Sequence, residues 1–395
     1  MSYTIPPDDN AIGNAGHTTQ HNNMADVLTG MGAVLNVQNT AYSGGADPTG
    51  VNDSTAAIQA AVNAGFSYLP AGTYKVSSTI TISLAGSGLT GPRGRWYHGT
   101  AGGPVIQPTS SFSGSSIINI TASEVELGNL TIDCSNVSGA ANTDGLDMTG
   151  NITNGYVHDI LIRNAPKYGF QAVYSSGSPF TSNFRKVIID GGCTSAMWNI
   201  ANMTDCMFDN CYAIGGAAQG WYIYGTGNTK MIGCRAEWSN VGYQVDGNSG
   251  FRDFQMVGCS TDRNTTHGLQ FTCTGTDPIT ITGFTANRDG AGSTSGNYAG
   301  VSIASAVTNP IVLTGLSVTS GKNDDGTGNA TPQFGVSFHS GTSPKFVSIV
   351  NGFINAITTA MDLSATTNFH TRCVYTSTGF PVPATFTNYN GGDIA

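Results

Sequence analysis

Three polar side chains recur at steps of 25 residues in the second half of the chain: Glu237, Asp262 and Asn287. Each is followed by a large side chain, respectively Trp238, Arg263 and Arg288. If this spacing places the groups on neighbouring strands, the two carboxyl groups approach the separation of roughly 5 to 5.5 Å that retaining glycosidases use. One would then act as general acid and the other as base or nucleophile. The aromatic ring and the guanidinium groups beside them are suited to holding a sugar or its acidic substituents.

Tyr243 and His267 lie close to these groups in the sequence and complete the set of candidate sugar-contacting residues. His267, together with Arg263, comes nearest to the basic group that a lyase places beside an acidic sugar. The competing interpretation is a row of exposed corner residues. In that case Arg263 and Arg288 only offset the repulsion between the like charges, and the row contributes little to the stability of the fold. A single histidine in a loop is likewise more often part of a polar surface. The sequence leaves both interpretations open.

Residues with metal-ligating side chains do not form a recognised metal motif. His17 and His21 are four residues apart and share one face if the segment is helical, but no carboxylate or cysteine accompanies them. Helix capping or packing therefore explains them better. Residues 322–326 offer oxygen atoms without the alternating acidic spacing of calcium loops, so a solvated turn is the simpler interpretation. The sequence predicts neither a bound metal nor a cofactor.

An internal repeat, running from residue 120 onward, predicts the elements that position these residues. One apolar strand position recurs about every 25 residues and is occupied by Leu130, Ile160, Val187, Cys211, Cys234, Cys259, Phe284, Leu316 and Phe353. A second position alternates with the first and is a small residue followed by Leu146, Phe170, Met197, Trp221, Tyr243, Leu269, Val301, Val336 and Met361. Two short strands per repeat, with glycine or asparagine at the corners, are typical of a parallel β-solenoid. Nine stacked rungs are expected.

Three cysteines, Cys211, Cys234 and Cys259, fall on the same strand position in consecutive repeats. Because equivalent residues stack one rung apart, we expect them to form an inward-facing column of small apolar side chains rather than disulfides or zinc ligands. The eight cysteines of the chain contain no Cys-x-x-Cys pair, which agrees with reduced thiols.

The composition excludes several classes of protein. Only 10% of the 395 residues are charged and the formal net charge is -9, so the chain lacks the lysine and arginine clusters that bind nucleic acid backbones. Its 39% of hydrophobic residues is more than disordered chains carry. The apolar runs fall far short of the ~20 residues that cross a bilayer. The start of the chain has neither the basic residues nor the apolar stretch of a secretory signal, so export through a signal peptide is not expected.

The chain is predicted to divide into three segments. Residues 1–40 differ from the repeat region and contain apolar residues at spacings of three and four, which predict a short helix with a thin apolar stripe. These residues are Met24, Val27, Leu28, Met31 and Val34. Such a stripe needs a partner, so residues 1–40 are expected to serve attachment or oligomerisation. Residues 41–365 are predicted to form the β-helix, beginning with a cap over 41–82, and residues 366–395 a C-terminal cap or tail.

Residues 42–82 carry a specific sequence pattern. A turn containing glycine and aspartate at 43–50 is followed by an alanine-rich helix that Asp53 or Ser54 caps, and the run Leu-Pro-Ala-Gly-Thr-Tyr at 69–74 then turns the chain into a strand. The pattern resembles the start of the pectate-lyase-like right-handed parallel β-helix superfamily, as found in phage tailspikes. The resemblance implies an all-β, right-handed parallel β-helix. The run Gly-His-Thr-Thr-Gln-His-Asn at 16–22 also resembles an N-terminal segment of minor tail proteins of actinobacterial phages.

These resemblances imply a phage tail protein, a tailspike or tail-tip minor tail protein, that attaches to a host-surface glycan. Such a protein is expected to be a homotrimer, to join other tail proteins through residues 1–40, and to be made in the host cytoplasm before it becomes part of the virion. The alternative is an envelope polysaccharide depolymerase, a glycoside hydrolase or pectate-lyase-like enzyme acting through Glu237 and Asp262. A bacterial surface solenoid is disfavoured because no export signal is expected.

Overall fold

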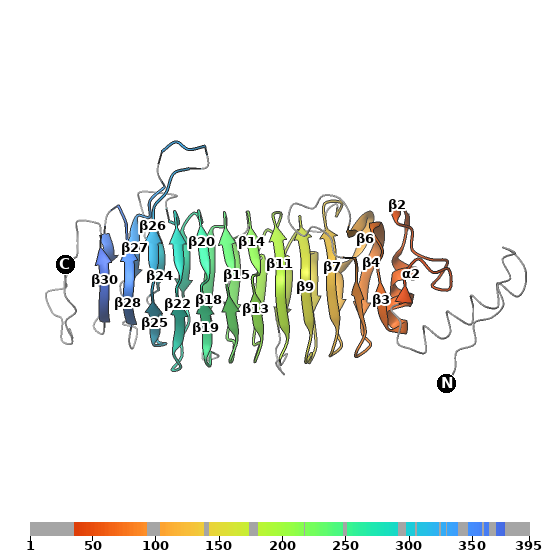
Figure 1. Ribbon diagram of the computed structural model, residues 1–395, viewed down its shortest axis with the longest axis horizontal. Helices are drawn as coiled ribbons and strands as arrows, with labels where there is room; N and C mark the ends of the chain where they lie inside the picture. Colours follow the sequence, from red (N-terminus) through yellow and green to blue (C-terminus); the bar gives the residue numbers. More distant parts are fainter. Residues whose placement is uncertain are drawn as a thin grey trace, which may run out of the picture.

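The chain forms an elongated rod of stacked parallel strands (Figure 1). The computed structural model describes residues 35–92, 103–137, 142–173, 181–216, 218–247, 251–290, 298–304, 306–323, 325–328, 330–338, 347–357, 359–362 and 369–375. The paired strands are parallel and step along the rod in sequence order, so the predicted all-β parallel β-helix is confirmed.

From β12 (Trp198–Ala201) to β26 (Ser317–Thr319) each turn of the rod contains three strands, one more than the two that the repeat predicted. The first sheet consists of β8 (Asp144–Met148), β10 (Phe170–Val173), β12 (Trp198–Ala201), β15 (Gln219–Tyr224), β18 (Val241–Asp246), β21 (His267–Phe271), β24 (Ala299–Ile303), β27 (Phe334–Phe338) and β29 (Thr359–Asp362). The second contains β13 (Met207–Asp209), β16 (Lys230–Ile232), β19 (Phe254–Val257), β22 (Ile279–Thr282) and β25 (Ile311–Thr314). The third contains β14 (Tyr212–Ile214), β17 (Arg235–Glu237), β20 (Ser260–Asp262), β23 (Thr285–Asn287) and β26 (Ser317–Thr319).

Longer strands complete the rod towards its ends. Strands that run through both the second and third sheets are β9 (Tyr156–Arg163), β11 (Asn183–Asp190), β28 (Val347–Ile354) and β30 (Phe369–Tyr375), and β9 pairs with β7 (Glu126–Asp133). The N-terminal strands are β1 (Leu35–Asn36), β2 (Thr49–Asp53), β3 (Phe66–Tyr68), β4 (Gly72–Ile82), β5 (Gly88–Thr90) and β6 (Pro104–Ile120). Because β30 pairs with β28, the stack continues past the boundary predicted at residue 365.

The helix α2 (Thr55–Ala64) packs at the N-terminal end of the stack. Its N-cap residue is Ser54, and the face predicted to be apolar is buried: Ala57, Ile58, Ala61 and Val62. The predicted helix over residues 24–34, and with it His17 and His21, lies outside the described residues. No helix in the described part of the chain is long and apolar enough to cross a membrane.

The core consists of columns of equivalent side chains. Cys211, Cys234 and Cys259 are at most 1% exposed and stand opposite one another on consecutive rungs, as predicted. Each Sγ lies 3.4–3.5 Å from a backbone carbonyl oxygen of the preceding turn, to which the thiol donates. Burial raises the pKa of Cys234, and hydrogen bonding to Cys234 together with burial raises that of Cys259. The thiols of Cys234 and Cys259 are therefore protonated packing groups.

Two positions of the predicted repeat are wrong by one residue. Phe170 pairs with Trp198, so Trp198 and not Met197 continues the column that leads to Trp221. Ser317 pairs with Phe353, which places Gly352 opposite Leu316. A slip of one residue along a strand turns its side chains to the other face, and Phe353 is accordingly 42% exposed.

Candidate functional site

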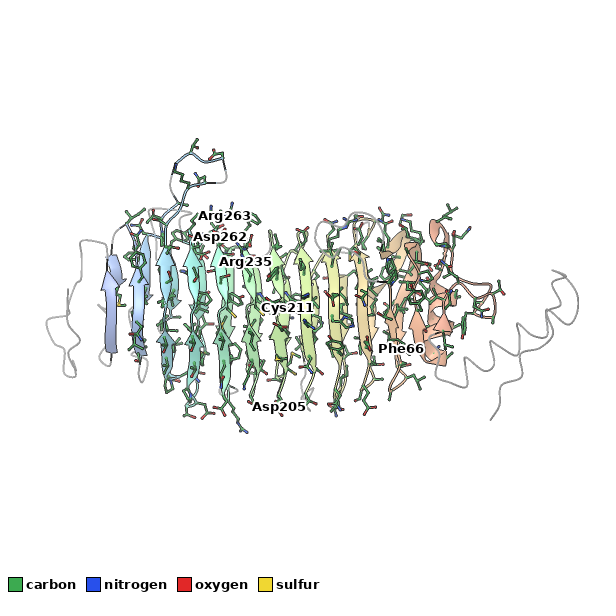
Figure 2. All side chains as sticks on the ribbon, viewed as in Figure 1. Phe66, Asp205, Cys211, Arg235, Asp262 and Arg263 are labelled. Atoms are coloured by element: carbon green, nitrogen blue, oxygen red, sulfur yellow. The ribbon has the colours of Figure 1, made fainter. Side chains whose placement is uncertain are left out.

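The polar groups that recur every 25 residues lie at one corner of the rod, where strands of the third sheet end. Glu237 of β17 pairs with Asp262 of β20, which pairs with Asn287 of β23, so the predicted stacking on consecutive rungs is confirmed. Their burial differs from the expectation of exposed corner residues: Glu237 is 7% exposed and Asp262 only 2%. Figure 2 shows Asp262 between Arg235 and Arg263 at this edge of the rod.

Arginine side chains donate hydrogen bonds to both carboxylate oxygens of Asp262. One oxygen, Oδ1, accepts from Arg288 Nε at 2.8 Å and from Asn287 Nδ2 at 3.1 Å, and Oδ2 accepts from Arg263 Nη2 at 3.0 Å and from Arg288 Nη2. Arg235 pairs with Glu237 and lies 3.7 Å from Asp262 Oδ2. With its oxygens engaged in this way, Asp262 is poorly placed to transfer protons. Burial raises the pKa of Glu237, and Arg235 partly offsets that effect.

The residues that follow the carboxylates adopt an unusual backbone conformation. Trp238, Arg263 and Arg288 have φ values of 51°, 57° and 58°, the left-handed region that glycine occupies at Gly191 and Gly215 on earlier turns. The Arg263 guanidinium lies over the Trp238 ring, 4.3 Å from its centroid. Trp238 is 43% exposed, so this stacked pair presents an aromatic surface to solvent.

Two predicted sugar-contacting residues lie elsewhere. Tyr243 is 0% exposed, and its ring stacks inside the core on Trp221, with 5.9 Å between centroids. Tyr243 cannot reach a ligand outside the rod, because the inward position that identified it as part of the repeat also buries it. His267 is 8% exposed and belongs to β21 of the first sheet, opposite Val241 and Ala299, so it lies on a strand rather than in the loop that its role assumed.

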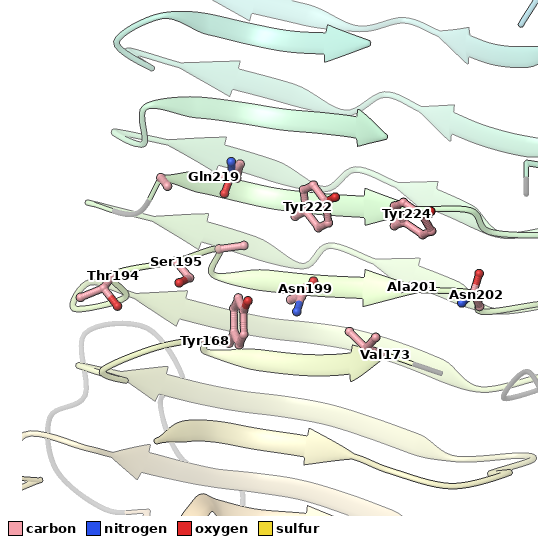
Figure 3. A pocket seen from close by; sticks show the side chains of 12 residues that line it. Tyr168, Val173, Thr194, Ser195, Asn199, Ala201, Asn202, Gln219, Tyr222 and Tyr224 are labelled. Carbon is pink, nitrogen blue, oxygen red and sulfur yellow. The ribbon is translucent and has the colours of Figure 1, made fainter. Parts of the chain in front are cut away.

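A groove of about 740 Å³ lies on the outer face of the first sheet, across β10, β12 and β15 (Figure 3). Three aromatic rings and three amides line it: Tyr168, Tyr222, Tyr224, Asn199, Asn202 and Gln219. Tyr222 and Tyr224 project outward because they alternate with the buried Trp221 and Ile223. The Tyr222 hydroxyl donates to Asp246 Oδ2 at 2.8 Å, which fixes the ring beside the opening.

Sequence reasoning missed this groove. The alternation of residues 219–224 could have shown that two tyrosines face outward, but their neighbours across the sheet depend on the register of β12, which was predicted one residue out. Rings flanked by amides and hydroxyls match the alternating apolar faces and hydroxyls of a sugar. This arrangement is suited to binding a carbohydrate.

The groove and the strand stack can be compared with known proteins. Residues 36–222 match the model of the rhamnogalacturonase A/epimerase, pectate lyase-like family. This segment runs from β1 to β15 of the parallel β-helix. No curated protein matches the chain in sequence.

Several solved structures align with most of the chain at low sequence identity. The enzymatically active domain of bacteriophage CBA120 tailspike protein 2 is 15% identical with a TM-score of 0.60, over 82% of this chain and 47% of that one. The gp42 tailspike of Acinetobacter phage vb_AbaP_AS12 is 15% identical with a TM-score of 0.60, over 92% and 66%. The A-module of the Azotobacter vinelandii mannuronan C-5 epimerase AlgE4 is 17% identical with a TM-score of 0.57, over 91% and 100%. The chain thus spans about half the length of the CBA120 domain.

A pair of buried acids lies on β8, the strand that pairs with β10 at the edge of the groove. Asp144 Oδ1 accepts from the backbone N–H of Tyr168 at 3.1 Å, and Asp147 pairs in register with Gln171, the neighbour of Asn199. Asp144 is 2% and Asp147 4% exposed, and Asp147 Oδ1 has no hydrogen-bond partner. Burial, reinforced by the charge of Asp144, raises the pKa of Asp147 to about 8, and burial also raises that of Asp144.

The free energy of unfolding should consequently fall as the pH rises from 3.8 to about 8. The folded chain keeps a proton on Asp147 up to about pH 8, whereas the unfolded chain releases it near the ordinary value of 3.8. Between these values the folded state binds more protons, so each increase in pH favours unfolding. In the wild type, unfolding should become easier by a few kcal/mol between pH 5 and pH 8.5, and Asp147→Asn is expected to remove this difference. Denaturant titrations at pH 5 and pH 8.5 measure it, and parallel curves for the variant and the wild type would show that Asp147 ionises normally.

Proposed function

We propose that this chain is a phage tail protein of the tailspike type, which holds a glycan of the host surface in the groove across β10, β12 and β15. The main support is the groove itself, where three tyrosine rings and three amides meet on a rigid sheet. The low charge of the chain, 10% of its residues, agrees with a surface that works through neutral hydrogen bonds and ring contacts. The fold shared with phage tailspikes is consistent with this role.

The proposal includes an assembly. The chain acts as a homotrimer in the virion, residues 1–40 join it to other tail proteins, and the rod carries the groove outward. The apolar stripe predicted within residues 1–40 supports this arrangement, because it has no partner of its own in the sequence. Light scattering tests it: a mass of three times 40.8 kDa is expected for the full chain, and a monomer would contradict the trimer.

Removing the Tyr222 ring should weaken glycan binding. Tyr222→Ala deletes one wall of the groove and is expected to lower the affinity for host-envelope polysaccharide about tenfold, roughly 1.4 kcal/mol. Tyr222→Phe keeps the ring and loses only the hydroxyl that donates to Asp246, so it should bind better than the alanine variant. Gln255→Ala, an outward residue of β19 in the second sheet, is the control. Equal affinities of the Tyr222→Ala and Gln255→Ala variants would show that the glycan does not bind in the groove.

Cleavage of the bound glycan is a second candidate function. It is favoured by the Asp144 and Asp147 pair, because a carboxylic acid that stays protonated at neutral pH is what a general acid needs. If this function holds, wild-type protein releases oligosaccharide from the envelope polysaccharide and Asp147→Asn does not. Binding without release leaves attachment as the function.

The same assay tests the role predicted for Glu237 and Asp262. A proton-transferring Glu237 would make Glu237→Gln slower by a factor of hundreds. The arginine partners of both carboxylates instead support a structural role, for which release by Glu237→Gln equals that of the wild type.

A further inference from the structure

We infer that the groove across β10, β12 and β15 selects an electrically neutral glycan and rejects chains of acidic sugars. This inference rests on the proposed function, glycan binding in the groove, and adds the chemical class of the ligand. It differs from what the names of the similar family and of the mannuronan epimerase would suggest, since pectate and mannuronan are acidic chains.

The described lining of the groove is uncharged, which favours a neutral ligand. Of the twelve described residues that line the groove, none is Asp, Glu, Lys, Arg or His. A carboxylate that enters a half-enclosed site loses part of its hydration, and it needs a cation or several donors in return. Arginine supplies such a partner most effectively, through two parallel hydrogen bonds. The described lining offers only amides, hydroxyls, rings and small side chains, which match neutral hydroxyl groups.

The titratable groups around the groove are mostly acids. Asp246 accepts from Tyr222 OH at 2.8 Å, Asp144 accepts from the backbone of Tyr168, and Asp147 continues the same outward row as Asn199. One cation borders it among the described neighbours: Lys167 Nζ lies over the Tyr168 ring, 4.8 Å from its centroid. That charge also acts on Asp144 and Asp147. Asp147 keeps its proton up to about pH 8 and adds no charge at neutral pH. The described surroundings thus set the one cation, Lys167, against the carboxylate of Asp246, and they give an incoming carboxylate no net attraction.

Three arginines of the rod lie away from the groove. Arg235, Arg263 and Arg288 belong to the third sheet and its corner, and Glu237 and Asp262 already pair with them. This cluster of arginines is thus on a different sheet from the groove. It cannot supply the counter-charge that an acidic sugar in the groove would need.

The test uses envelope polysaccharide of the host, separated on an anion exchanger into neutral and acidic fractions. A portion of the acidic fraction has its carboxyl groups reduced to alcohols, which leaves chain length and linkage unchanged. The full-length protein is expected to bind the neutral fraction at least tenfold more tightly than the acidic one, and reduction should restore binding. If the acidic fraction binds best and reduction weakens it, the inference is wrong while glycan binding stands. If no fraction binds, the proposed function fails as well.

A charge placed in the groove provides a second test. Gln219→Arg keeps a donor for Gln244, whose Oε1 accepts from Gln219 Nε2 at 3.0 Å, and adds a cation to the lining. This variant should bind the acidic fraction about tenfold more tightly than the wild type. Gln255→Arg makes the same change in net charge on the second sheet and should have little effect. Equal gains in the two variants would mean that net charge, and not the groove, governs selection, which overturns the inference.

Discussion

Replacing Asp262 by alanine is expected to lower the free energy of unfolding by about 3 to 5 kcal/mol. Asp262 is 2% exposed and accepts hydrogen bonds from Arg263, Arg288 and Asn287. Without the carboxylate, the guanidinium groups of Arg263 and Arg288 remain close together in a partly buried corner, where the remaining carboxylate, Glu237, already pairs with Arg235. The loss therefore includes repulsion among cations as well as the missing hydrogen bonds. Denaturant titration at one pH measures it.

A matched control lies on the same rod. Asp209 pairs with Arg185 at 3.5 Å, and its side chain is 27% exposed, so Asp209→Ala removes an ion pair that water already screens. Such pairs contribute about 0 to 1 kcal/mol. Equal destabilisation by Asp209→Ala and Asp262→Ala would mean that the corner network is an ordinary surface arrangement.

Trp198→Ala is expected to cost a similar amount, about 3 to 5 kcal/mol, through the core. The Trp198 ring is 0% exposed, stacks on Trp221 with 4.3 Å between centroids, and meets the edge of Phe208. Its Nε1–H donates to the Tyr212 carbonyl at 3.2 Å, so the variant leaves a cavity and also loses this hydrogen bond.

Trp238→Ala is the control for Trp198→Ala, because it makes the same chemical change at a site that is 43% exposed. Its loss should stay near 1 kcal/mol, the value of its contact with Arg263. Chemical denaturation of both variants compares them directly. A Trp198→Ala protein as stable as Trp238→Ala would show that the aromatic column does not hold the rungs together.

The sequence was sufficient to predict the fold because a solenoid repeats its signal. Each rung adds another example of the same apolar position, so Cys211, Cys234 and Cys259 could be aligned without coordinates. Local errors arose where two apolar residues stand side by side. Met197 and Trp198 are both buried, and nothing in their types tells which one faces the core column.

The candidate site was less accessible to prediction. Repeat spacing brought Glu237 and Asp262 together correctly, but it could not reveal that Arg235, two residues before Glu237 on the same strand, pairs with Glu237 and approaches Asp262. The groove depends on outward side chains, which carry no apolar periodicity. Tyr222 and Asn199 become neighbours only through the pairing of β12 with β15.

The corner network also affects how the rod resists being pulled along its length. Hydrogen bonds between turns run parallel to the long axis, so axial tension is shared among the bonds of each interface. The third-sheet strands β17, β20 and β23 have only three residues each, whereas β9 and β11 have eight residues that span two sheets. Asp262 links side chains from three successive turns at this thinner stretch. Pulling these turns apart therefore requires separating Asp262 from its arginine partners, in addition to breaking the backbone hydrogen bonds between the strands.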